Sequence, residues 1–155
     1  MNKVFQFINL IFLSFLLGHF ANGQSAVYVY KDVETGKGDY VFVYGMPSVE
    51  VAEDTAKSRI AAQGYQMENI QKYASTESKG HGLIIRSVFP SKVEPNKKPV
   101  LMVVYGVAIG CESYEAAEKK SIENMKEFNP EWDPEKYSYK VIQRFYDEPE
   151  AAAKN

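Results

Sequence analysis

Apolar and polar residues alternate in two early segments of the chain, and this pattern predicts a β-hairpin. Residues 26–31 and 40–44 change character at every second position, which is the spacing at which strand side chains switch faces. The polar, glycine-containing segment 34–39 between them predicts the turn. This hairpin supplies the first two strands of the predicted fold.

A helix and a third strand are predicted to follow the hairpin. Ser48 suits a helix N-cap, since its hydroxyl can accept a hydrogen bond from an otherwise unpaired backbone N–H. Apolar residues then recur at helical spacing at Val49, Ala52, Ala56 and Ile60. Gly64 is well placed to end the helix, and residues 65–73 are predicted to form the third strand.

The second half of the chain has the same order of predicted elements. Residues 83–89 and 100–105 are predicted strands joined by a loop that contains proline and lysine. Ser113 is the predicted cap of a helix whose inner face would consist of Tyr114, Ala117, Ser121, Met125 and Phe128. Pro130 and Pro134 break the chain after this helix, and residues 137–146 form the last predicted strand.

Three short segments recur in the same order and indicate an internal duplication. The matching segments are 43–45 with 104–106, 48–53 with 113–118, and 70–73 with 142–145. We therefore expect two tandem ββαβ units, 26–73 and 83–146, within one α+β domain that covers 24–146. The remaining residues, 147–155, are expected to form a mobile acidic tail.

The predicted order of elements favours a mostly antiparallel sheet with the two helices packed on one side. The sequence leaves a second arrangement open, in which each unit forms a smaller sheet and the two sheets lie side by side. The two arrangements differ in which sheet faces are exposed.

The first residues of the chain have the character of a cleavable signal peptide. Lys3 precedes an apolar stretch that is shorter than the roughly 20 residues needed to cross a bilayer. Small residues at Ala21 and Gly23 fit the positions that a signal peptidase reads, so cleavage is predicted before Gln24. We expect residues 1–23 to be removed, the mature protein to be secreted or periplasmic, and no membrane span to remain.

Composition argues against several classes of function. The chain has 18 Lys and Arg against 20 Asp and Glu, and its basic residues form only short groups. Because phosphate binding needs clustered Lys and Arg, no nucleic-acid partner is expected. One cysteine, Cys111, and one histidine after the signal, His81, are too few for the usual zinc sites. We expect neither a metal nor a cofactor.

Cys111 and His81 nevertheless form one alternative hypothesis, a thiol-dependent enzyme. Cys111 follows Gly110 close to the predicted start of the second helix, a position that can depress the pKa of a thiol. A histidine nearby would complete a nucleophile and base. No known nucleophile motif surrounds Cys111, so the absence of enzymatic activity is the preferred prediction.

In the first hairpin the aromatic residues have even numbers and the valines have odd numbers. The valines are Val27, Val29, Val41 and Val43. If the helices cover a valine face, the opposite face is an aromatic surface suited to contact with proteins or sugars. The candidate binding residues are therefore Tyr28, Tyr30, Tyr40, Phe42 and Tyr44. Alternatively, the fold itself or a second copy of the chain covers this face, the latter giving a homodimer.

Residues 40–73 resemble half of a sporulation-related repeat domain, a family that binds peptidoglycan glycan strands. The similar features are a strand ending in Gly45, a helix from Ser48, and the Gly64-Tyr65 entry to a strand. Residues 85–90 resemble the start of that family's second half, but the loop 91–99 then replaces its helix. The resemblance implies no particular binding residue in this chain.

These observations predict an exported, non-enzymatic binding or interaction protein whose partner is a protein or a glycan. A peptidoglycan- or glycan-binding module of the cell envelope is the first alternative, and the thiol enzyme is the second.

Overall fold

Residues 24–91 and 98–147 are described by the computed structural model, and they form two three-stranded sheets and two helices. The strands are β1 (Gln24–Lys31), β2 (Gly38–Met46), β3 (Ile70–Thr76), β4 (Gly80–Pro90), β5 (Leu101–Cys111) and β6 (Tyr139–Asp147). The helices are α2 (Val49–Ala61), α3 (Tyr114–Phe128) and the short 3-10 helix η1 (Met67–Asn69). The predicted signal peptide and residues 148–155 of the predicted tail lie outside the described residues.

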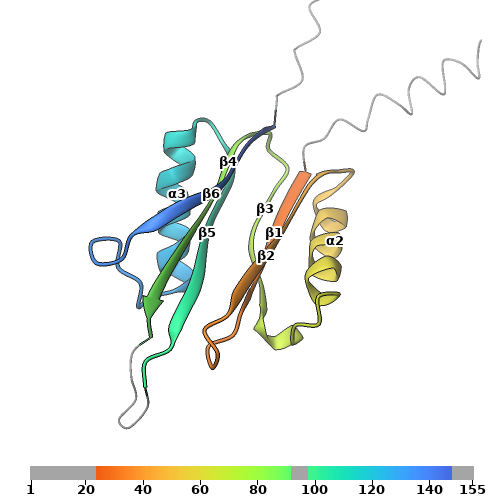
Figure 1. Cartoon of the computed structure of the whole chain (residues 1–155). Coiled ribbons are helices and arrows are strands. Elements are labelled where there is room, and N and C mark those ends of the chain that lie inside the picture. The colour runs from red at the N-terminus through yellow and green to blue at the C-terminus, as the bar shows by residue number, and fades with distance from the viewer. Residues whose placement is uncertain (1–23, 92–97, 148–155) are drawn as a thin grey trace, which may run out of the picture.

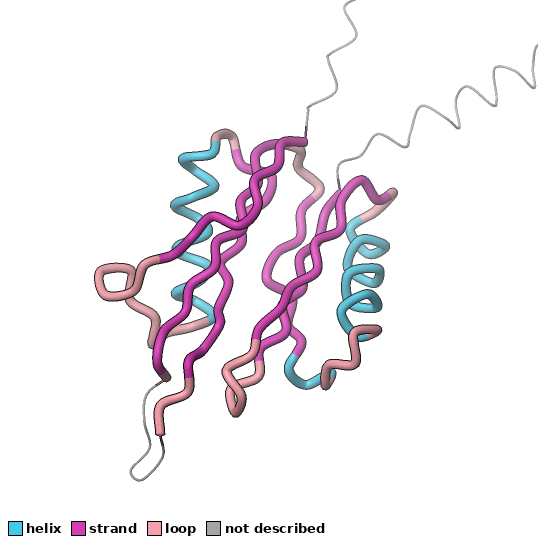
Figure 2. Tube along the Cα trace, viewed as in Figure 1, coloured by secondary structure: helices cyan, strands magenta, loops and turns pink. Residues whose placement is uncertain are grey.

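The two sheets stack face to face, and each carries its helix on the outside (Figures 1 and 2). Both are antiparallel, with strand orders β2-β1-β3 and β5-β4-β6, as expected for ββαβ units. Of the two arrangements that the sequence left open, the protein has the two smaller sheets. Each helix therefore covers one side of its own sheet, and the helices lie on opposite outer faces of the molecule (Figure 1).

Stacking explains why two sheets replace one. A single sheet with both helices on one side would leave its second apolar face open to water. Stacking two sheets buries those second faces against each other. The resulting central layer contains residues of both sheets, namely Val27, Val29, Tyr73, Ile84, Tyr105 and Val107.

Serine caps start both helices, as predicted. The Ser48 side chain accepts a hydrogen bond from the Val51 backbone N–H, and the Ser113 side chain accepts one from Ala116. Helix α2 meets its sheet through small residues, with Ala52 and Ala56 packed on Ala26 and Val43. Helix α3 packs on a larger apolar layer, which includes Trp132 from the segment after the helix.

The two units share the register of their hairpins, including its irregularities. The matching terminal pairs are Gln24–Met46 in the first hairpin and His81–Cys111 in the second. A β-bulge follows each of these pairs. Gly45 and Gly110 occupy equivalent places in the two bulges, with φ angles of 69° and 67°. Such matching irregularities are expected of two copies of one structural unit.

The register corrects two of the segment matches made from the sequence. The structural counterpart of Gly45 is Gly110, whereas Gly106 lies in the middle of β5. Similarly, Tyr73 and Ile142 occupy the equivalent bulges of β3 and β6, so 70–73 does not align with 142–145. The repeated Val-Tyr-Gly sequence was misleading because β5 is longer than predicted and contains both Gly106 and Gly110.

Two predicted strand boundaries also differ from the structure. Strand β3 begins at Ile70 rather than at residue 65, because η1 comes first and Tyr65 stacks on Tyr30 with ring centroids 3.9 Å apart. Strand β5 continues to Cys111, since Gly106 is a tolerated strand residue that lies directly under α3.

Polar side chains join the two units along the side where β3 approaches β5. Asn124 of α3 accepts a hydrogen bond from the Val107 N–H at 2.9 Å and donates one to the Tyr73 carbonyl at 3.2 Å. Lys31 donates to the carbonyl of Phe128 at the end of α3. These contacts hold the sheets together on this side. Within the described part of the chain, no helix is long and apolar enough to cross a membrane.

Candidate functional site

The predicted all-aromatic face of the first hairpin does not exist, because the hairpin register mixes the two kinds of residue. Val27 pairs with Phe42, and Tyr28 pairs with Val41. Directly paired residues of antiparallel strands lie on the same face. Odd-numbered residues of β1 therefore share a face with even-numbered residues of β2. As a result, each face of the hairpin carries both valines and aromatic residues.

Tyr28 and Tyr30 lie on the side of the sheet that faces α2. Tyr28 packs with the small residues beneath that helix. Tyr30 is 7% exposed, stacks on Tyr65 and donates a hydrogen bond to Asp32 at 3.3 Å. These contacts give both tyrosines a place in the core of the first unit, away from the space between the sheets.

Tyr40, Phe42 and Tyr44 point towards the second sheet. The Tyr40 ring packs on Tyr105 and the Phe42 ring on Phe145, with centroid separations of 5.2 and 4.3 Å. Tyr44 stacks beside Phe42 at 5.4 Å and is 66% exposed. The structure thus separates the five predicted binding residues into two groups, and only this second group lies between the sheets.

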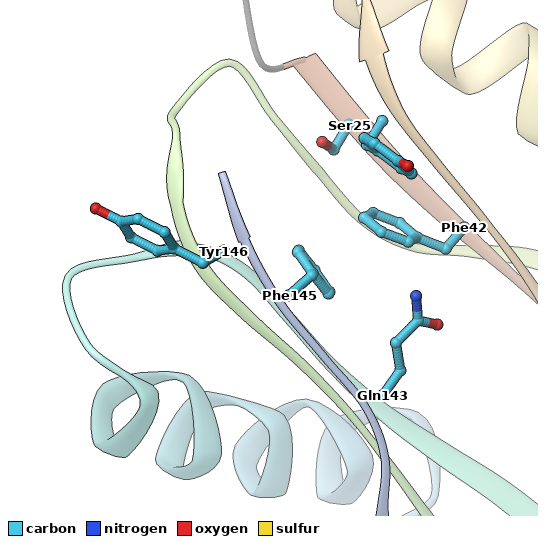
Figure 3. Close-up of a pocket in the computed structure, with 6 residues that line it drawn as sticks. Ser25, Phe42, Gln143, Phe145 and Tyr146 are labelled. Atoms are coloured by element: carbon cyan, nitrogen blue, oxygen red, sulfur yellow. The ribbon is translucent and has the colours of Figure 1, made fainter. Parts of the chain in front are cut away.

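A cleft of about 240 Å³ opens between the sheets beside these rings. Strands β1, β2 and β6 line it with Ser25, Phe42, Tyr44, Gln143, Phe145 and Tyr146. Figure 3 shows the packed rings of Phe42 and Phe145 beside each other at the cleft, with Gln143 below them. Tyr146 turns outward at the rim, where its ring packs on His81 with centroids 4.5 Å apart.

Gln143 supplies an oriented polar group to this aromatic surface. The hydroxyl of Tyr40 donates a hydrogen bond to Gln143 Oε1 at 3.1 Å. Because this bond occupies the carboxamide oxygen, the amide nitrogen points towards Phe42 and can donate to a ligand (Figure 3). Burial of the Tyr40 hydroxyl, together with the nearby Asp39 carboxylate, raises its pKa, so it remains a donor at neutral pH.

The six residues that line the cleft carry no formal charge at neutral pH. A cleft of this composition favours a neutral ligand over an ion, since a buried charge without a partner is strongly disfavoured. Its rings and amide are suited to stacking and hydrogen bonding. They include no nucleophile activated by a base.

The equivalent place in the other half of the molecule is closed. By register, Val107 replaces Phe42 there. A Cβ atom added to Gly110 would lie 2.9 Å from the Ser78 carbonyl oxygen, whereas one added to Gly45 would meet nothing within 4 Å. The duplicated backbone therefore has one open side and one closed side, and bulky aromatic residues occur on the open side.

Cys111 and His81 are neighbours across β4 and β5, but their surroundings do not activate the thiol. Cys111 is buried in the layer beneath α3, and its thiol approaches the Ile109 carbonyl oxygen at 3.8 Å. Burial raises the pKa of the Cys111 thiol, which disfavours the thiolate nucleophile. The His81 ring packs against Tyr114 and Tyr146. In the first unit, Gln24 and Met46 form the equivalent pair. The closeness of His81 and Cys111 therefore follows from the hairpin register.

Among the described residues, no three His, Cys, Asp or Glu side chains gather closely enough to hold a metal ion.

Sequence reasoning found Phe42 and Tyr44 but missed the four other residues that line the cleft. Gln143, Phe145 and Tyr146 come from the last strand of the second unit, and Ser25 from the start of the first. The alternation of residues along a strand assigns faces only within that strand. The stacking of one sheet on the other, which brings β2 to β6, has no local signal in the sequence.

Comparisons with protein-family models, with curated proteins and with solved structures find no match to this chain. The resemblance of residues 40–73 to half of a sporulation-related repeat domain gains no support from them. The candidate site is therefore defined by its own geometry.

Proposed function

We propose that this protein is an exported, non-enzymatic binding protein that holds a neutral sugar ring of an envelope glycan in the cleft between its sheets. The observation that carries the proposal is the cleft lined by Phe42, Tyr44, Phe145 and Tyr146, with the amide of Gln143 directed into it. The export part rests on the signal-peptide pattern of residues 1–23, which lie outside the described structure.

The aromatic rings support a ligand that has a flat apolar face. Aromatic side chains offer rigid apolar area together with a polar edge, and a pyranose ring has C–H groups on one face and hydroxyls around its rim. Tyr44 is 66% exposed, so its ring is accessible at the mouth of the cleft. Rings held in advance by the fold lose little conformational freedom on binding.

The polar groups and the size of the cleft support a sugar rather than a purely apolar side chain of a protein partner. The Gln143 amide can donate to a hydroxyl or carbonyl oxygen, and a purely apolar group would leave that donor unpaired. The volume of about 240 Å³ lies below the range of about 300–1,000 Å³ typical of drug-sized ligands. The cleft therefore suits one ring of a longer chain.

Co-sedimentation of the exported protein with isolated peptidoglycan sacculi tests this function. We expect saturable binding that the Tyr44→Ala substitution weakens about two- to tenfold, since one ring contact is worth about 0.5–1.5 kcal/mol. Because Tyr44 is largely exposed, its replacement should leave the free energy of unfolding unchanged within about 0.5 kcal/mol.

Leu101→Ala is the matched control for this experiment. Leu101 is 65% exposed at the start of β5, beside Gly36 in the turn of the first hairpin, whereas Ser25 of the cleft lies at the opposite end of β1. Its replacement should leave binding to sacculi unchanged. Equal loss of binding in both variants, or no saturable binding of the unmodified protein, would contradict the proposal.

A further inference from the structure

Gln24 lies at the start of β1, next to the cleft. It pairs with Met46 at the end of the first hairpin, and its neighbour Ser25 lines the cleft. The carboxamide oxygen of Gln24 is buried and accepts no hydrogen bond from the described residues. Gln24 is also the residue that the signal-peptide pattern places at the new amino terminus.

We propose that Gln24 is a modification site, and that the exported protein carries it as an amino-terminal lactam, or pyroglutamate. The inference rests on the export part of the proposed function, because it requires a free α-amine on Gln24.

The reaction needs no oxidant, reductant or co-reactant. The lone pair of the α-amino nitrogen attacks the side-chain carboxamide carbon, Cδ, to form a new N–Cδ bond. The Cδ–Nε2 bond then breaks, a proton passes from the α-nitrogen to Nε2, and ammonia leaves. The product contains a five-membered ring and has no charge at its amino terminus.

The surroundings of Gln24 suit the neutral product better than the charged amine. A free α-amine has a pKa of about 8 and would be positively charged at neutral pH. That charge would lie at half-buried Gln24, next to the cleft whose lining carries none. The lactam retains one N–H and both carbonyl groups, so the residue can still pair with Met46. Ring closure also disrupts no hydrogen bond to the buried carboxamide oxygen.

Intact-mass measurement of the exported protein, combined with enzymatic removal of pyroglutamate, tests this inference. The full chain, beginning at Met1, is expressed in a host that exports it and is purified from the exported fraction. We expect the mass of residues 24–155 less one ammonia, a terminus that resists amino-terminal sequencing, and release of that block by a pyroglutamyl aminopeptidase.

Three results would overturn the inference, and each has a separate meaning. The full mass of residues 24–155, without the loss of ammonia, together with a terminus that can be sequenced, would show that Gln24 does not cyclise. A terminus at another position would show that cleavage occurs elsewhere, and retention of Met1 would also remove the export part of the proposed function. Loss of sugar binding would leave this mass unchanged, so failure of the binding proposal is distinguishable.

The Gln24→Ala variant is the control for other blocking groups. Alanine has no side-chain carboxamide and cannot form the lactam, so the exported variant should have an open terminus that can be sequenced. A blocked terminus in this variant as well would assign the block to another modification and contradict the proposal.

Discussion

Gly106 has a different role from the one its sequence context predicts. The predicted strand 100–105 would end just before Gly106, but Gly106 lies inside β5 directly beneath α3. A Cβ atom at this position would lie 2.1 Å from the Ser121 carbonyl oxygen and 2.8 Å from the Met125 Cβ atom. The absence of a side chain at Gly106 therefore determines how closely α3 approaches the sheet.

Replacement of Gly106 with alanine should destabilise the protein strongly. The clash involves helix backbone, which cannot rotate aside, so we expect a loss of about 3 kcal/mol in the free energy of unfolding, measured by urea denaturation. Gly45→Ala is the comparison, because its Cβ would meet nothing within 4 Å and only its positive φ is strained. That variant should lose about 1 kcal/mol. A Gly106→Ala loss no greater than the Gly45→Ala loss would contradict this account of the helix contact.

Tyr73 makes the stability of the protein depend on pH in the alkaline range. Its hydroxyl is buried and makes no hydrogen bond of normal geometry with the described residues. Burial raises its pKa from 10.0 to about 12, and the nearby Asn129 side chain opposes this rise only in part. Between these values the unfolded chain has released the proton while the folded protein retains it. Stability therefore falls as the pH rises from 10 to 12, and this one group accounts for about 3 kcal/mol.

The Tyr73→Phe variant isolates this contribution. Phenylalanine keeps the ring that stacks on Phe128 at 3.9 Å and removes the unpaired hydroxyl. At pH 7 the variant should be at least as stable as the unmodified protein, since no hydrogen bond to the described residues is lost. Urea denaturation between pH 9 and about 12 should show a smaller decline than in the unmodified protein. Equal declines in the two proteins would show that Tyr73 does not titrate in this way.

At the scale of elements, Asn124 joins α3 to strands of both sheets. Its carboxamide pairs with a backbone N–H of β5 and a backbone carbonyl of β3, which otherwise lie at the edges of different sheets. Two edge groups that would need water are thereby paired inside the molecule. This bridge, together with Lys31 at the end of α3, explains why the side of the molecule near β3 and β5 is closed.

Asn124→Ala should therefore destabilise the contact between the units. The substitution removes the hydrogen bonds of Asn124 to the Val107 N–H and to the Tyr73 carbonyl. We therefore expect the free energy of unfolding to fall by about 2 kcal/mol. Glu123→Ala, at an exposed neighbouring position on the same helix, should change it by less than about 0.5 kcal/mol. Chemical denaturation of the two variants measures the difference, and equal values for them would show that the bridge contributes nothing.

Local sequence patterns predicted the elements well and their pairing less well. The serine caps and helical spacing indicated both helices, because these signals act within a few residues. The faces of the first hairpin were assigned wrongly, since they depend on which residue of β1 meets which residue of β2. Alternation on each strand carries no information about that register.

At the scale of the whole molecule, duplication and asymmetry together produce the candidate site. The shared register gives two equivalent sides between the sheets. Small residues and the Asn124 bridge close one of them, whereas aromatic residues of β2 and β6 hold a cleft open on the other. Strand alternation indicated that Phe42 and Tyr44 share a face, but their meeting with Phe145 depends on sheet stacking over a long sequence separation.

The aromatic cleft between the sheets is the proposed binding site. The test is an NMR titration of the protein with soluble peptidoglycan glycan strands, in which the side-chain amide resonances are followed. The Gln143 amide lies in the cleft and the Asn124 amide lies on the closed side, so the second serves as an internal reference. We predict a saturable shift of the Gln143 resonance with the Asn124 resonance unchanged. Saturable shifts elsewhere that leave Gln143 unmoved, or no shifts at all, would contradict the account.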